Sequence, residues 1–193
     1  MPHSHDLALE DQIRECFGRV AYTHKTHERM ADRCSKTLAR YKLLQIGLTA
    51  LTSAGAIGVV IGNETWVEVA TALCSAVTLF VSAYLKNFDP GGIAQQHRDT
   101  AAQLWNVREC YLSLLTDLPQ LTRDEAIVRR EELQSTLAAL YIAAPRTDGK
   151  AYSEAQDRLK NREDLTFSDD EIDCFLPLSL KRSAGRKKPP SDS

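Results

Sequence analysis

The stretch GAIGVVIGNETWVEVATAL, residues 55–73, decides the fold, because two apolar runs meet there across a short acidic turn. Residues 43–62 are 20 consecutive uncharged positions, and residues 69–85 are another 17. At about 1.5 Å of rise per residue, the first run forms a helix of about 30 Å, the hydrocarbon thickness of a bilayer. We therefore predict a transmembrane hairpin over residues 43–85 with its turn at 63–68. A hairpin buried in a soluble helical protein is the alternative.

The charges that flank the two runs predict the orientation of the hairpin. Six basic residues lie among the 21 that precede the first run, and Lys86 and Arg98 follow the second run. The turn contains Glu64 and Glu68 but no basic residue. Since basic residues concentrate on the cytoplasmic side of a membrane, we expect both termini in the cytoplasm and the turn outside.

Small residues recur every four positions in the first run and form a ridge along one side of the predicted helix. This small-residue ridge consists of Ala50, Ala54, Gly58 and Gly62. Small side chains allow a second membrane helix to approach closely, so we predict that the ridge is a surface for helix packing.

Hydroxyl side chains share one face of the second run. This hydroxyl row consists of Thr71, Ser75, Thr78 and Ser82, spaced by four, three and four residues. In one interpretation the hydroxyls bond to backbone carbonyls one turn earlier, or join one helix to another. In the other, they face water and line the pore of an oligomer.

The N-terminal arm, residues 7–42, carries apolar and small polar residues at alternating steps of four and three, as in helices that pack along a partner. This seam consists of Ile13, Phe17, Val20, His24, His27, Ala31, Cys34, Leu38, Tyr41 and Gln45. Because no proline or glycine interrupts residues 19–46, we expect the arm to continue straight into the first span. His24 and His27 occupy seam positions, where they either set the register or form a pH-sensitive or metal-binding pair.

We predict that residues 86–178 form a cytoplasmic helical region. Asp89 is a candidate N-cap before Pro90, and the helix at about 90–117 repeats the seam at His97, Ala101, Leu104, Arg108, Tyr111 and Leu115. Thr122 and Glu125 form a capping box that opens a helix to about Tyr141, and a more polar helix follows at 150–163. A second capping box, at Ser168 and Glu171, precedes a short helix, and we expect residues 179–193 to form a basic disordered tail.

Composition and motifs argue against several classes of function. A net charge of −2 gives no field for nucleic acid, and five scattered cysteines indicate reduced thiols and not disulfides or a zinc site. The N-terminus is acidic where an export signal is basic, so we expect no cleaved signal. We find no phosphate-binding loop or nucleophile motif, and therefore predict a protein that is not an enzyme and needs no metal or other cofactor.

Three segments, residues 84–118, 144–160 and 166–182, resemble the SLATT family, two-helix membrane domains encoded beside bacterial nucleotide-signalling and defence genes. The similarity is most specific at the family motif, His97, Trp105, Arg108, Glu109 and Tyr111. With no fused sensor domain, the chain is similar to the branch found near reverse-transcriptase genes. The resemblance gives these motif residues a structural role and no catalytic one.

The resemblance implies an all-α effector of the bacterial inner membrane: a two-helix transmembrane hairpin with a long N-terminal helix and a cytoplasmic helical bundle. Such an effector is expected to form homo-oligomers, to perturb or permeabilise the bilayer, and to cause growth arrest or cell death when a cytoplasmic signalling or defence partner encoded nearby activates it. The alternative is a non-conducting membrane scaffold that recruits a cytoplasmic defence or signalling enzyme. Neither function involves nucleic acid.

Overall fold

The computed structural model describes residues 4–62, 65–161 and 165. These residues form α1 (Ser4–Ile61), α2 (Thr65–Phe88), α3 (Pro90–Asp117), the short 3-10 helix η1 (Leu118–Gln120), α4 (Arg123–Ala143) and α5 (Gly149–Asn161). No strand occurs among them, so the predicted all-α class is confirmed. Part of the expected turn (Asn63 and Glu64), the second capping box and the basic tail 179–193 lie outside the described residues.

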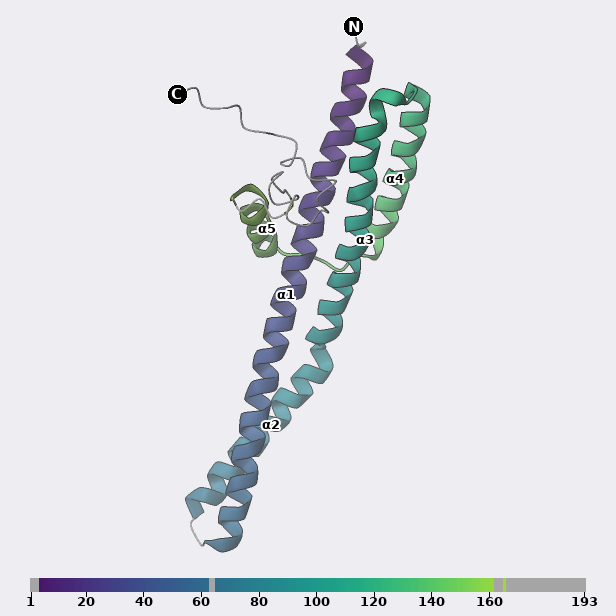
Figure 1. Ribbon diagram of the computed structural model, residues 1–193. Helices are drawn as coiled ribbons and strands as arrows, with labels where there is room; N and C mark the ends of the chain where they lie inside the picture. Colours follow the sequence, from purple (N-terminus) through teal and green to yellow (C-terminus); the bar gives the residue numbers. More distant parts are fainter. Residues whose placement is uncertain (1–3, 63–64, 162–164, 166–193) are drawn as a thin grey trace, which may run out of the picture. The chain divides into compact units, whose positions relative to one another are not determined.

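The N-terminal arm and the first span form one helix, as expected. α1 has 58 residues and no proline, and is therefore about 87 Å long. It lies along α2 at one end and along α3 at the other (Figure 1). A displacement of α1 in the bundle is consequently a displacement of the first membrane segment as well.

The hydrophobic core lies where α1, α3 and α4 pack together. Ile13 and Val20 of α1, Leu104 and Tyr111 of α3, and Ala126 of α4 are among its buried side chains. Every seam position predicted on α1 and α3 is buried or half-buried. Leu133, Leu137 and Leu140 of α4 pack against this core.

The predicted helix starts are present in the structure. The Thr122 hydroxyl accepts from the backbone N–H of Glu125, while the Glu125 carboxylate accepts from that of Thr122 at 2.9 Å, so the capping box of α4 is complete. These hydrogen bonds lower the pKa of Glu125. At the start of α3, the Asp89 side chain accepts from the N–H of Gly92 at 3.0 Å.

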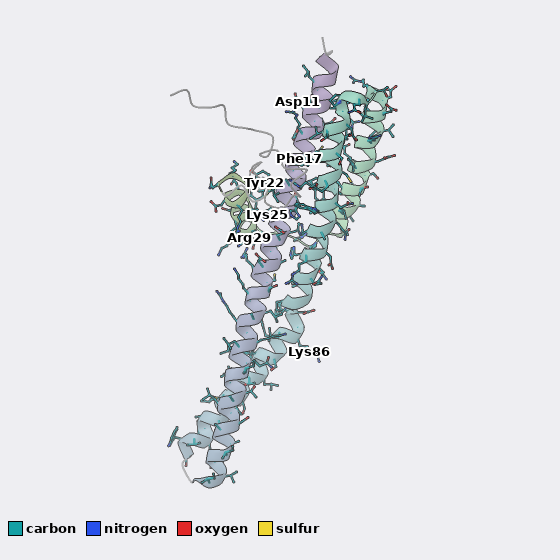
Figure 2. The ribbon with its side chains drawn as sticks, in the orientation of Figure 1. Asp11, Phe17, Tyr22, Lys25, Arg29 and Lys86 are labelled. Carbon is teal, nitrogen blue, oxygen red and sulfur yellow. The ribbon has the colours of Figure 1, made fainter. Side chains whose placement is uncertain are left out.

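Residues Met1–Ala155 form one compact unit and Gln156–Ser193 a second, whose described part is residues 156–161 and Leu165. Within the first unit, the beginning of α5 packs on α1. The Tyr152 ring lies 6.0 Å from that of Tyr22, and the Arg29 Nε donates to Glu154 at 3.2 Å. Figure 2 labels Tyr22 and Arg29 on α1.

Candidate functional site

The hairpin is held together by a row of half-buried residues that continues the seam of α1. The α1 residues that face α2 are Tyr41, Gln45, Leu48, Thr52, Gly55 and Val59, again spaced by four and three. The spacing continues beyond Gln45, so the sequence contained the signal for this surface although we predicted the seam only to that residue.

The hydroxyl row lies mainly between the two helices of the hairpin. Thr71, Thr78 and Ser82 are half-buried, whereas Ser75 is exposed. The hydroxyls of Ser75, Thr78 and Ser82 donate to backbone carbonyls four residues earlier, at distances of 2.7–2.9 Å. Ser82 Oγ also accepts from the Gln45 Nε2 of α1 at 2.8 Å. The first interpretation, in which the hydroxyls bond to backbone carbonyls and join the two helices, expects these hydrogen bonds. The lining of a pore stays a prediction.

Gly55 lies in close contact with α2. A Cβ atom at this position would overlap the Thr71 hydroxyl and would lie 3.2 Å from the Thr71 Cβ. Any larger side chain at position 55 would therefore force the two helices apart, because Thr71 is β-branched and stiff. Our sequence analysis gave Gly55 no role in packing, although it lies on the continued seam.

The small-residue ridge does not face α2 of the same chain. All four ridge residues are exposed, although the Cβ position of Gly58 lies 3.5 Å from Val67 of α2. The ridge follows a different side of α1 from the row of residues that contacts α2. Ala50 and Ala54 are therefore left uncovered by the helices that the structure describes.

Most large side chains of the two spans are uncovered in the single chain. Leu43 is 72% exposed, Val60 85%, Leu79 72% and Phe80 71%. A soluble protein buries such side chains, whereas lipid covers them in a membrane protein. By length and composition, two of the described helices are able to cross a bilayer. The exposure argues against the soluble, buried hairpin.

A sharp joint connects α2 to α3. Asp89 has φ 34° and ψ 64°, the left-handed conformation, so the helix direction changes there while its carboxylate caps α3. A Cβ atom on Gly92 would overlap this carboxylate, and one on Gly91 would lie 3.2 Å from Leu38 of α1. The two glycines therefore allow the capped joint to sit directly against α1.

The family motif residues lie at or beside the interface between α1 and α3. The structure brings His97 to His27, with 2.9 Å between the two Nδ1 atoms, and places the Trp105 ring 5.3 Å from that of His24. The guanidinium of Arg108 stacks on the Trp105 ring at 4.7 Å and ion-pairs with Glu109.

A second aromatic contact fixes Arg108, which lies 5.3 Å from the ring of Phe17 on α1. Tyr111 is fully buried beside Cys16. The motif thus joins α3 to the long helix α1.

Burial shifts the acid–base properties of this interface. Burial and the nearby His97 and His24 lower the pKa of His27 to about 4, and burial lowers the pKa of His97. Burial, reinforced by Cys16, raises the pKa of Tyr111. All three groups are therefore held neutral near pH 7, as expected where a charge would lose its hydration.

Within residues 4–62 and 65–161, no group of three or more His, Cys, Asp or Glu side chains is placed to hold a metal ion. The described residues provide two helices long and apolar enough to cross a membrane, the Asp89 joint, and a polar interface between α1 and α3.

Comparison with known proteins gives one match. The model of the SMODS and SLOG-associating 2TM effector domain family 4 matches residues 9–171 of the 193. No curated protein and no solved structure matches the chain. The family's two transmembrane segments correspond to the two apolar helices α1 and α2. The chain therefore belongs to this SLATT effector family and is a membrane protein.

Proposed function

We propose that this membrane effector acts in a bacterial antiphage or conflict system by assembling with itself in the inner membrane and permeabilising it. Growth arrest or death of the host cell follows. The action is physical and requires no catalytic group or cofactor. A cytoplasmic partner encoded nearby releases it.

The observation that carries the proposal is the exposed small-residue ridge. Ala50 and Ala54 are exposed in the single chain, although small residues on a membrane helix favour close packing of a second helix. Since α2 packs elsewhere on α1, the ridge is free to bind the hairpin of another copy. Self-assembly through this face supplies the closed ring that a pore needs.

The charges at the ends of the spans support the orientation. Lys36, Arg40 and Lys42 precede the first span and Lys86 ends the second, and all four are exposed. They are suited to the anionic lipid of the cytoplasmic leaflet, where each contributes about 1 kcal/mol. Both termini and the helical bundle then lie in the cytoplasm.

Three parts of the molecule have distinct roles in this mechanism. The α1–α3 interface sets the resting state, the Asp89 joint transmits movement to α2, and polar residues of the hairpin line the path. Of the hydroxyl row, Ser75 is exposed already, while Thr78 and Ser82 become available to water when α2 turns away from α1.

Cross-linking in membranes tests the assembly. We expect Ala54→Leu to abolish oligomers and toxicity, because the larger side chain holds the ridge away from a second helix. Ala76→Leu is the matched control, since Ala76 is an exposed alanine of α2 outside the ridge. Equal oligomers and equal toxicity in the two variants, at equal abundance in the membrane, would reject the ridge as the assembly surface.

A further inference from the structure

Two buried imidazoles meet between α1 and α3, in the part of the chain outside the membrane. His27 is 2% exposed and His97 is 1% exposed, their Nδ1 atoms are 2.9 Å apart, and their ring centroids are 5.0 Å apart. They bridge positions 70 residues apart in the sequence and join two helices that lead to different spans.

The contact depends on the number of protons that the pair holds. In the neutral pair, one Nδ1–H donates to the other Nδ1, which accepts. When both rings are protonated, two N–H groups oppose each other, the hydrogen bond is lost, and two positive charges lie in a site closed to water. Each added charge also loses its hydration there.

The surroundings neutralise such a charge only in part, because Asp148 favours protonated His97 but burial outweighs this effect. No carboxylate of the described residues forms an ion pair with either ring, and Asp148, which faces His97 from the segment before α5, is bound by Arg33. Other charged or titratable groups within four residues of the pair are His24, Lys25, Glu28 and Arg29 on α1 and Arg98 and Asp99 on α3, and Tyr141 of α4 lies against Thr23. Lys25 and His24 share Glu28, Arg98 and Asp99 both bond Gln95, and the Tyr141 hydroxyl lies 3.4 Å from that of Thr23.

We propose that His27 and His97 form a proton-operated latch, so that acidification of the cytoplasm parts α1 from α3 and releases the hairpin. α1 continues without a break into the first span, and α3 is joined to the second span through Asp89. Parting of the two helices at the histidines therefore separates the cytoplasmic ends of the two spans. The link between this opening and permeabilisation rests on the proposed function, whereas the opening itself does not.

The direction of the effect follows from the two pKa shifts. Both histidines have lowered pKa values in the closed state, so the closed interface has its full stability above the ordinary value of 6.5 and loses it as the pH falls toward about 4. In the open state the rings are hydrated and titrate normally. At about pH 5.5, the lowered pKa of His27 alone favours opening by about tenfold relative to neutral pH, and the lowered pKa of His97 acts in the same direction.

His24 provides a matched control, one turn away on the same helix. It is also buried, but its Nδ1 bonds the backbone carbonyl of Ala101 at 2.9 Å, and its Nε2 lies 3.8 Å from the carboxylate of Glu28. Both ring nitrogens of His24 therefore lie beside an oxygen atom, whereas the Nδ1 atoms of the pair lie against each other.

Fluorescence of Trp105 in the full-length protein, reconstituted in lipid nanodiscs, tests the latch. The chain has two tryptophans, so Trp66→Phe leaves Trp105 as the reporter, with its ring 5.3 Å from that of His24 across the interface. Between about pH 7.5 and about pH 5, we expect a red shift that begins as the pH falls below the ordinary histidine value of about 6.5. His24→Gln should keep this transition and His27→Gln/His97→Gln should lose it.

Circular dichroism at neutral pH checks that each variant is folded. If the double variant is not folded, each single variant replaces it, and we expect a shallower transition that follows one proton. A wild-type spectrum unchanged down to about pH 5, or a full transition in the folded histidine variants, would overturn the latch. A normal transition without permeabilisation would contradict the proposed function alone.

Discussion

Gly55 shows how a single position sets the distance between the two spans. Its missing side chain leaves room for the Thr71 hydroxyl of α2, which would overlap any Cβ atom at position 55. Gly47 lies on the same helix, in the same apolar run, and has nothing within 4 Å of its Cβ position. A substitution at Gly55 therefore tests the close contact with Thr71, and the same substitution at Gly47 measures the general effect of altering this helix.

We predict that Gly55→Leu destabilises the hairpin by about 1–3 kcal/mol, because the new side chain overpacks the contact with Thr71. Thermal unfolding of the purified protein in detergent measures the change. Gly47→Leu, the control, should leave the unfolding temperature close to that of the wild type. If both leucines lower it equally, the close approach at Gly55 is not what holds the hairpin.

Tyr111 presents a buried hydroxyl that makes no hydrogen bond of ordinary geometry among the described residues, and its polar neighbour is the weakly bonding thiol of Cys16. Burial of such a group without a strong hydrogen bond is costly, so its removal should not harm the fold. We predict that Tyr111→Phe keeps the free energy of unfolding within about 0.5 kcal/mol of wild type, or raises it. A loss of more than about 1 kcal/mol in chemical denaturation would show that the hydroxyl does stabilise the interface.

Among the elements, the junction of α2 and α3 has the most unusual backbone. Asp89 adopts a left-handed conformation that a non-glycine residue seldom takes, and its carboxylate caps the N-terminus of α3. A short polar side chain tolerates this conformation because it bonds locally, here to Gly92. The cap therefore fixes the direction in which α3 leaves the membrane.

We predict that Asp89→Ala lowers the stability of the bundle by about 0.5–2 kcal/mol, since the cap is lost and alanine disfavours positive φ. Asp89→Asn, which keeps an acceptor oxygen, should retain most of the stability in the same denaturation assay. Thr122→Ala removes a cap of similar worth from α4, away from the joint. Toxicity should fall in Asp89→Ala but not in Thr122→Ala; equal toxicity in both would exclude transmission through the joint.

The sequence predicted those features that depend on neighbours along the chain. Proline-free periodicity predicted α1 as one helix, and the cap residues Asp89 and Thr122 located the starts of α3 and α4. It did not predict the pairing of His27 with His97, because two seams on separate helices leave the register between them open. Likewise, the first span has two faces suited to helix packing, the small-residue ridge and the continued seam. Only the three-dimensional structure showed that Gly55 of the seam, and not Ala54 of the ridge, contacts α2.

The molecule as a whole consists of a bundle with a buried core and a hairpin whose outward faces are uncovered. Residues of the bundle such as Ile13, Leu104 and Tyr111 are completely buried, while the outward side chains of both spans are open. Lipid covers such side chains in a membrane protein, and the proposed assembly with other copies of the chain would cover part of them as well. In the proposed mechanism, these copies rearrange so that the polar faces of their hairpins line a path for water across the membrane.

Volume-matched changes in the hydroxyl row test whether that face conducts. Thr78→Val with Ser82→Ala removes two hydroxyls with little change in shape, so packing should survive at unchanged membrane abundance. We expect toxicity to fall if water must pass these positions. Full toxicity in the double variant would leave the hydroxyls as packing groups that bond α2 to its own carbonyls and to Gln45.

The membrane potential of living cells is the quantity that the proposed function must change. A depolarisation-sensitive dye would be followed during induced expression of the intact protein, with and without its genomic neighbours, and with Ala54→Leu and Ala76→Leu as the assembly variant and its control. We predict depolarisation that precedes the loss of viability, absent in Ala54→Leu and retained in Ala76→Leu. A steady potential at equal membrane abundance, even with the neighbours present, would contradict permeabilisation and favour a non-conducting scaffold.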